Sequence, residues 1–246
     1  MRRSPHTCEM FTAAAQRTGR YLADLLQPAT CVFCGGTESG KLVCHGCYAD
    51  LPWIQFACER CGTPLAAPLQ TGVVCGSCQQ RPPPFYSTIA PLHYDFPLDA
   101  AIKALKFERR LYLAPAMASL ALPRLAPLAD SFDALVPVPL YRCRHARRGF
   151  NQAQELAKYL HRFTALPVRH CVARTRPTEP QSGLDAATRK SNMSGAFRMT
   201  TVPRCQRPLI IDDVMTTGET CRVLASTLLA AGVERVGVLT IAHASP

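Results

Sequence analysis

Four Cys-x-x-Cys pairs follow one another in the first third of this chain, and they restrict its possible folds more than any other feature. They are Cys31/Cys34, Cys44/Cys47, Cys58/Cys61 and Cys75/Cys78. Two such pairs can place four sulfur atoms around one tetrahedral Zn²⁺, and a site with four protein ligands leaves no position for water or substrate. The spacing therefore predicts two structural Zn²⁺ sites, and folding of residues 31–80 should depend on the metal.

The sequence leaves two assignments of these ligands open. Sequential pairing gives one site from the first two pairs and one from the last two, whereas crossed pairing exchanges partners between the sites. Disulfides in a secreted protein are the other common use of many cysteines. However, the N-terminus lacks the apolar core of a signal peptide, and the sequence contains no run of 18 apolar residues. We therefore expect a soluble, cytoplasmic protein with reduced thiols and no transmembrane segment.

The length of 246 residues has room for one mid-sized domain and a small one. Apolar residues near Leu22 predict a short amphipathic helix before the cysteines. The segment Arg81-Pro82-Pro83-Pro84 has the composition of a stiff linker directly after the last pair. We therefore predict an N-terminal helix at 1–30, a double zinc ribbon at 31–81 and a second domain at 86–246.

From Tyr86 onward, short β-rich runs alternate with helical periodicity, which is typical of α/β domains with a parallel sheet. The strands that we expect are 87–94, 134–139, 168–173, 208–211 and 236–241. A polar, proline-broken stretch from Arg174 to Asn192 predicts a long loop, and long loops in compact domains often serve as lids.

Two neighbouring carboxylates, Asp212 and Asp213, follow the apolar run at 208–211. Open parallel sheets bind ligands at the carboxyl ends of their strands. Small hydroxyl residues and Gly218 come next and lead into a helix, whose free amide groups attract an anion. Carboxylates accept hydrogen bonds from a diol, so the combination predicts a ribose phosphate as ligand. The alternative is an ordinary strand, turn and helix with solvated acids.

These residues carry a resemblance to known proteins. Residues 212–220 resemble the phosphoribosyl pyrophosphate signature of type I phosphoribosyltransferases. Together with the cysteine pairs and with 136–140, 148–153, Gln181, Arg189 and Asn192, they resemble the ComF family over nearly the whole chain. The family implies a double zinc ribbon before a phosphoribosyltransferase-like parallel sheet with helices on both faces. It also implies phosphoribosyl pyrophosphate bound with Mg²⁺, and a link to DNA uptake in natural transformation.

The resemblance also implies roles for individual residues. Asp212 and Asp213 would hold the ribose hydroxyls and serve as the catalytic carboxylates. The 5′-phosphate would lie on the backbone and side chains of Thr216, Thr217, Gly218 and Thr220. The pyrophosphate would lie near the turn at 138–140, and the ligand site would be completed by Arg148, Gln181 and Arg189.

The chain carries 28 Lys and Arg against 17 Asp and Glu, a formal charge of +11, and only five of the cations are Lys. The planar fork of Arg suits phosphate groups. Two functions agree with these features: a phosphoribosyltransferase, and a non-catalytic adaptor that handles single-stranded DNA with the same fold. Competence machinery proteins are the partners that the family suggests, and they could hold the chain at the inner face of the membrane. Acceptor and oligomeric state stay open.

Overall fold

The computed structural model describes residues 30–37, 41–66, 73–176 and 195–244. The predicted N-terminal helix therefore lies outside the described residues, as do the predicted site residues Gln181 and Arg189. The chain divides into two compact units, Met1–Asp50 and Leu51–Pro246. The first contains the first two cysteine pairs, and the second contains the last two pairs together with the α/β domain.

The described part of the first unit is a small turn-rich module. Thr30 and Thr37 form an antiparallel bridge, and the amide of Cys31 donates to the carbonyl of Gly36 at 2.7 Å. A short helix, α2 (His45–Ala49), begins after Cys44, whose sulfur accepts from the Cys47 amide at 3.4 Å. Each cysteine pair therefore lies in a tight turn, as the spacing predicts.

The second unit begins with the other two cysteine pairs, which are joined to the sheet by backbone hydrogen bonds. This segment contains an antiparallel bridge between Ala57 and Pro64 and the helix α3 (Gly76–Gln80). The amide of Thr88 in the first strand donates to the Glu59 carbonyl at 2.9 Å. The boundary between compact units thus falls at Asp50, whereas the predicted linker at 81–84 lies inside the second unit.

The sheet of the second unit is parallel, in the order β1 (Ser87–Ile89), β7 (Gly237–His243), β6 (Pro208–Met215) and β3 (Ala134–Pro137). β2 (Leu92–His93) also pairs with β7, so the expected strand at 87–94 is broken at Ala90-Pro91. β6 continues past Ile211 to Met215 because β7 pairs with it as far as His243. The carboxylates therefore lie within the strand, and the polar loop begins later than expected.

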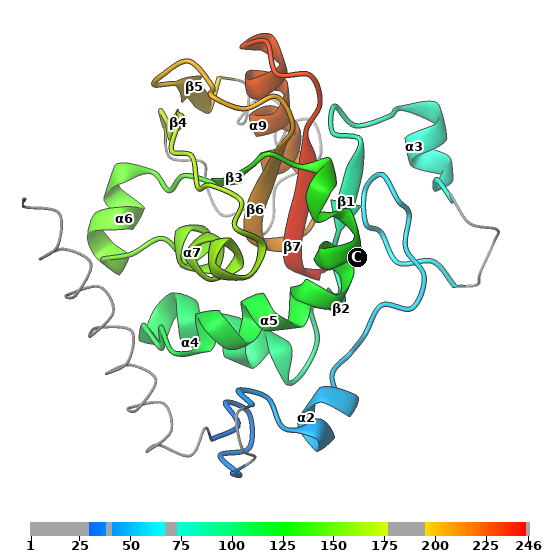
Figure 1. Ribbon diagram of the computed structural model, residues 1–246, viewed down its shortest axis with the longest axis vertical. Coiled ribbons are helices and arrows are strands. Elements are labelled where there is room, and N and C mark those ends of the chain that lie inside the picture. The colour runs from blue at the N-terminus through cyan, green and yellow to red at the C-terminus, as the bar shows by residue number, and fades with distance from the viewer. Residues whose placement is uncertain (1–29, 38–40, 67–72, 177–194, 245–246) are drawn as a thin grey trace, which may run out of the picture. The chain divides into compact units, whose positions relative to one another are not determined.

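Helices cover both faces of this sheet, as predicted (Figure 1). α4 (Leu98–Glu108), α5 (Leu113–Leu125), the 3₁₀ helix η1 (Ala126–Ser131) and α6 (Arg142–Arg148) come before α7 (Gln152–Thr164). α5 and α7 contact each other, and α7 packs on β3 and β6. α9 (Glu219–Ala230) joins β6 to β7 and packs on the other face of the sheet. The chain moves across the sheet from β6 to β7 in the direction opposite to its passage from β1 to β3. Because both crossovers are right-handed, their helices lie on opposite faces.

The row of side chains beneath α9 defines that face. Val136, Ile210 and Val238 are direct cross-strand neighbours, and all three are buried in one core with Leu224 and Leu228 of α9. Successive side chains of a strand point to opposite faces. The neighbours of Ile210 along β6 therefore face α5 and α7.

A small antiparallel sheet lies beside the main one. It consists of β4 (Val172–Arg174) and β5 (Phe197–Met199). The expected strand at 168–173 is divided: Val168 makes a parallel bridge with Leu135 at the edge of the main sheet, and the chain then enters β4.

Candidate functional site

Asp212 and Asp213 lie in β6, at register positions that place them on opposite faces of the sheet. Asp212 shares the face of Ile210 and α9, and Asp213 shares the face of α5 and α7. Asp213 is buried, with 3% of its surface exposed, whereas Asp212 is half-buried. Two carboxylates that are adjacent in sequence thus have different surroundings.

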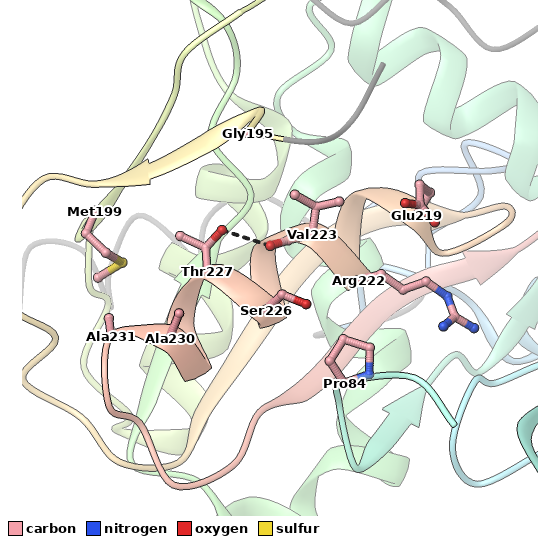
Figure 2. A pocket seen from close by; sticks show the side chains of 10 residues that line it. All are labelled: Pro84, Gly195, Met199, Glu219, Arg222, Val223, Ser226, Thr227, Ala230 and Ala231. Carbon is pink, nitrogen blue, oxygen red and sulfur yellow. Dashed lines mark hydrogen bonds between the residues drawn. The ribbon is translucent and has the colours of Figure 1, made fainter. Parts of the chain in front are cut away.

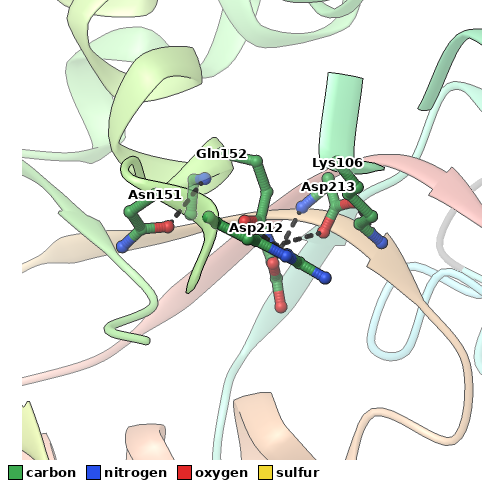
Figure 3. A network of polar contacts seen from close by, with 7 residues as sticks. Lys106, Asn151, Gln152, Asp212 and Asp213 are labelled. Atoms are coloured by element: carbon green, nitrogen blue, oxygen red, sulfur yellow. Dashed lines mark hydrogen bonds and ion pairs between the residues drawn. The ribbon is translucent and has the colours of Figure 1, made fainter. Parts of the chain in front are cut away.

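Asp213 is held by side chains from two helices (Figure 3). The ammonium group of Lys106, from α4, forms an ion pair with Asp213 Oδ2. Gln152 Nε2, at the start of α7, donates to Asp213 Oδ1 at 3.5 Å. Arg148 donates in turn to Gln152 Oε1 at 3.0 Å, so a chain of polar contacts links α6, α7 and β6.

Asn151 fixes the beginning of α7 against the turn that follows β3. Its Oδ1 accepts from the Ala153 amide at 3.0 Å, which caps the helix, and its Nδ2 donates to the Val138 carbonyl at 2.9 Å. Asn151 is itself buried. The predicted pyrophosphate turn at 138–140 and the Gln152 side chain are therefore set by the same residue.

The pKa values of two groups at this site, the Asp212 carboxyl and the Lys106 ammonium, are both raised. Burial raises the pKa of the Asp212 carboxyl well above its usual value, and the charge of Asp213 raises it further. Burial alone would lower the pKa of Lys106, but the charge and contact of Asp213 outweigh it, so this pKa is raised. Lys106 is therefore a cation at neutral pH, and its positive charge favours the ionised form of Asp212.

The predicted phosphate turn follows β6 directly. Thr216 and Thr217 are exposed, and Gly218 adopts a left-handed conformation with φ of 71° at the N-cap of α9. Among the described residues, no side chain caps this helix, so the amide groups of its first turn are available to a ligand. Thr220 lies in that first turn. This part of the predicted site is thus one continuous segment on the α9 side of the sheet.

Sequence reasoning missed the role of two residues in the network. Lys103 and Lys106 are three residues apart in α4, which is a helical spacing, but Lys103 pairs with Asp99 at 2.7 Å whereas Lys106 reaches Asp213. Gln152 could have been identified from the sequence, because it belongs to the segment 148–153 that carries the family resemblance. For Lys106 the sequence offers no comparable signal, because the contact joins distant parts of the chain.

The eight cysteines of the four pairs form two clusters of four, in sequential order. Cluster one is Cys31, Cys34, Cys44 and Cys47, and cluster two is Cys58, Cys61, Cys75 and Cys78. The sulfurs of Cys34 and Cys44 are 3.7 Å apart, as are those of Cys61 and Cys75. Ligands of tetrahedral Zn²⁺ with Zn–S bonds of about 2.3 Å are separated by about 3.8 Å. Both clusters thus fit a double zinc ribbon.

The thiols of cluster two also show why a cation suits it. Burial raises the pKa of Cys78 far above its usual value, and the sulfurs of Cys61 and Cys75 raise it further. The four thiols cannot all ionise next to one another without a positive charge between them. A bound Zn²⁺ supplies that charge and keeps the ligands as thiolates.

A pocket of about 730 Å³ lies along the outer side of α9, next to β5 (Figure 2). Its lining includes Val223, Thr227 and Ala230 of α9 and Met199 of β5. These helix positions are partly or fully exposed, whereas Leu224 and Leu228 of the same helix are buried in the core. Asp212 and Asp213 do not line the pocket, although Glu219, in the first turn of α9, does.

In the described part of the chain, every helix is too short or too polar to cross a bilayer.

Comparison with known proteins identifies the family. The double zinc ribbon domain matches residues 22–79, and the phosphoribosyl transferase domain matches residues 145–245. The DNA utilization protein YhgH of Escherichia coli (strain K12) is 35% identical over 207 residues, which cover 80% of this chain and 88% of that protein. Competence protein F of Haemophilus influenzae is 30% identical over 227 residues, which cover 87% of this chain and 96% of that protein. The chain therefore belongs to the ComF family, in which a double zinc ribbon precedes a phosphoribosyltransferase domain.

Proposed function

We propose that this protein binds phosphoribosyl pyrophosphate with Mg²⁺ at the end of β6 that carries Asp212 and Asp213 and at the turn that begins α9, and that it acts in the uptake or use of DNA. One observation carries the proposal: a carboxylate and an uncapped helix N-terminus lie on the same face of the sheet, joined by only a few residues. The names of the relatives, a DNA utilization protein and a competence protein, support the biological setting.

The chemistry of each part fits one part of this ligand. Carboxylate oxygens at β6 would accept hydrogen bonds from the ribose hydroxyls. The backbone amides at the start of α9, with the positive end of its dipole, would hold the 5′-phosphate. Arg148 and the turn after β3 would lie beside the pyrophosphate, whose charge the bound Mg²⁺ would neutralise. Gln181 and Arg189 remain predictions for the same site.

If the protein is a transferase, the bond from C1′ to the pyrophosphate oxygen breaks and a bond from C1′ to a nitrogen nucleophile forms. Positive charge develops on the sugar as the pyrophosphate leaves with its bonding electrons. The half-buried carboxylate of Asp212 would stabilise that charge, and Arg148 would stabilise the leaving group. The chain's own contribution is thus orientation and electrostatic stabilisation.

Isothermal titration calorimetry on zinc-replete protein tests the proposal. We expect heat of binding with phosphoribosyl pyrophosphate and Mg²⁺, and much weaker binding by Asp212→Asn, which keeps the shape of the side chain. Ribose 5-phosphate is the matched ligand that lacks the pyrophosphate. Absence of heat with the wild-type protein would rule out the proposed ligand. Release of pyrophosphate in the presence of candidate bases separately tests catalysis.

A second candidate function is a non-catalytic adaptor for single-stranded DNA. The observation that favours it is an exposed aromatic ring beside cations: Phe107 is 65% exposed, and the Arg148 guanidinium lies 5.2 Å from its ring centroid. Aromatic rings and Arg together suit stacking and phosphate contacts in single-stranded nucleic acid. An adaptor should bind an oligonucleotide with a log–log salt slope of about −0.7 per neutralised phosphate, without release of pyrophosphate. An affinity for the oligonucleotide that does not change with salt concentration would exclude this function.

A further inference from the structure

The acceptor oxygens of Asp213 are already engaged. Lys106 occupies Oδ2 and Gln152 occupies Oδ1, and the side chain has almost no contact with solvent. A ribose hydroxyl could bind Asp213 only by displacing one of these partners. Both partners belong to the chain, and they come from two different helices.

Asp212 differs in each of these respects. It is half-buried, and it shares a face with α9, whose N-terminus is the predicted phosphate site. Its Oδ1 accepts from the Asp213 amide at 2.9 Å, which is a backbone contact within the strand and not a contact with a helix side chain. The strand register therefore places Asp212, and not Asp213, on the side where a ribose 5-phosphate would lie.

The charge balance explains why Lys106 is needed. Two adjacent carboxylates repel each other, and an unpaired buried charge, here that of Asp213, is strongly unfavourable. The side chain of Lys106 is only 19% exposed, so its charge is poorly screened by solvent. It therefore neutralises Asp213 effectively and relieves the repulsion on Asp212.

We propose that the two aspartates have different roles: Asp212 is the carboxylate that contacts the ligand, and Lys106 is a positioning residue that holds Asp213 as a structural anchor. This inference rests on the proposed function for its ligand. It also identifies Lys106 as part of the site, although Lys106 lies in α4, far from the signature segment in sequence.

Ligand affinity in a set of isosteric variants tests the proposal. We expect Asp212→Asn to weaken binding of phosphoribosyl pyrophosphate with Mg²⁺ by on the order of tenfold to a hundredfold, as for loss of a charged hydrogen bond. Lys106→Met should also weaken binding, because the charge of Asp213 is then unpaired beside a polyanionic ligand. The double variant Lys106→Met/Asp213→Asn removes the pair together, and it should restore the affinity to within about threefold of the wild type.

The double variant separates the two possibilities. If Asp213 contacts the ribose, the double variant will bind as weakly as Asp212→Asn, and the proposal is wrong. A merely structural role for Lys106 would change the thermal stability of Lys106→Met but leave its affinity unchanged, and that result would also overturn the positioning role. Each variant's zinc content and melting temperature confirm that it is folded.

A measurement without ligand distinguishes this proposal from the proposed function. In a double-mutant cycle on unfolding, Lys106→Met should couple to Asp213→Asn and much less to Asp212→Asn. Failure of the wild-type protein to bind phosphoribosyl pyrophosphate would overturn the proposed function and the ligand role of Asp212. The pairing of Lys106 with Asp213 would still be decided by this cycle, and equal coupling to both aspartates would refute it.

Discussion

The two cysteine clusters have the same ligand spacing within each pair, yet they are connected to the protein in different ways. In the part of the chain that the structure describes, the backbone hydrogen bonds around cluster one join nearby residues, such as the amide of Val32 and the carbonyl of Leu42. Cluster two belongs to the larger unit, and its turn is bonded to the first strand of the sheet: Thr88 contacts the carbonyls of both Glu59 and Arg60. The same pair of Cys-x-x-Cys motifs can therefore stabilise a small module alone, as in the first unit, or form part of a larger domain, as in the second unit.

The largest expected effect is loss of a ligand in cluster two. Cys78→Ser leaves a buried site without its full metal shell, and structural Zn²⁺ contributes roughly 10 kcal/mol to the folding of small zinc modules. Because cluster two is bonded to β1, we expect the main thermal transition of the protein to fall by more than about 10 °C. Differential scanning calorimetry measures it, together with zinc content.

Cys34→Ser is the matched change in cluster one. It should reduce the zinc content from two ions to one and leave the main transition nearly unchanged, because Cys34 belongs to the other compact unit. Cys143→Ser, an exposed thiol outside both clusters, controls for the loss of a cysteine as such. Equal falls in the main transition for Cys34→Ser and Cys78→Ser would contradict the difference between the clusters.

A second pair of variants compares the glycines that follow Cys34 and Cys61. Gly35 and Gly62 both have φ of 73°, but a Cβ at Gly62 would lie 2.7 Å from Cγ2 of Thr88, whereas a Cβ at Gly35 meets nothing within 4 Å. Gly62→Ala should therefore lower the free energy of unfolding of the larger unit by about 3 kcal/mol, from backbone strain and overpacking together. Chemical denaturation measures this free energy.

Gly35→Ala carries only the backbone strain of about 1 kcal/mol, and that strain falls on the first unit. It should therefore leave the main unfolding transition in place. If the two alanine variants destabilise that transition equally, the contact between the cluster two turn and β1 has no energetic importance.

How much of this could be predicted from sequence depends on how far apart the interacting residues are. The clusters could be predicted because each set of four ligands lies within a short segment, and the structure shows the sequential order that the spacing allowed. The strand, turn and helix that carry the proposed phosphate site could be predicted for the same reason, since β6, Gly218 and α9 are consecutive. The parallel sheet and its helices followed from periodicity, although β6 proved longer because pairing with β7 overrides the polar character of its end.

What could not be predicted depends on distant contacts. The ion-pair partner of Asp213 is Lys106 of α4, and the turn of cluster two is bonded to Thr88 of β1. Neither contact could be predicted from a local sequence pattern. The expected strand ended at Ile211, so the sequence did not place the two aspartates on opposite faces of the sheet, and only the structure shows which helices meet each one. The different roles proposed for them follow from that information.

The smallest predicted effect concerns the hydroxyl group of Thr88. Its Oγ1 donates to the Arg60 carbonyl at 2.6 Å, and this is a direct link between the cluster two turn and the sheet. Thr88→Val keeps the β-branched shape and removes the donor, so we expect a loss of about 1 kcal/mol in the free energy of unfolding. Thr88→Ser is the control that keeps the hydroxyl donor. It loses only the methyl group, which should have a small effect of its own on the free energy of unfolding. A Thr88→Val variant as stable as the wild type would show that the backbone bond to Glu59 alone is sufficient to join cluster two to the sheet.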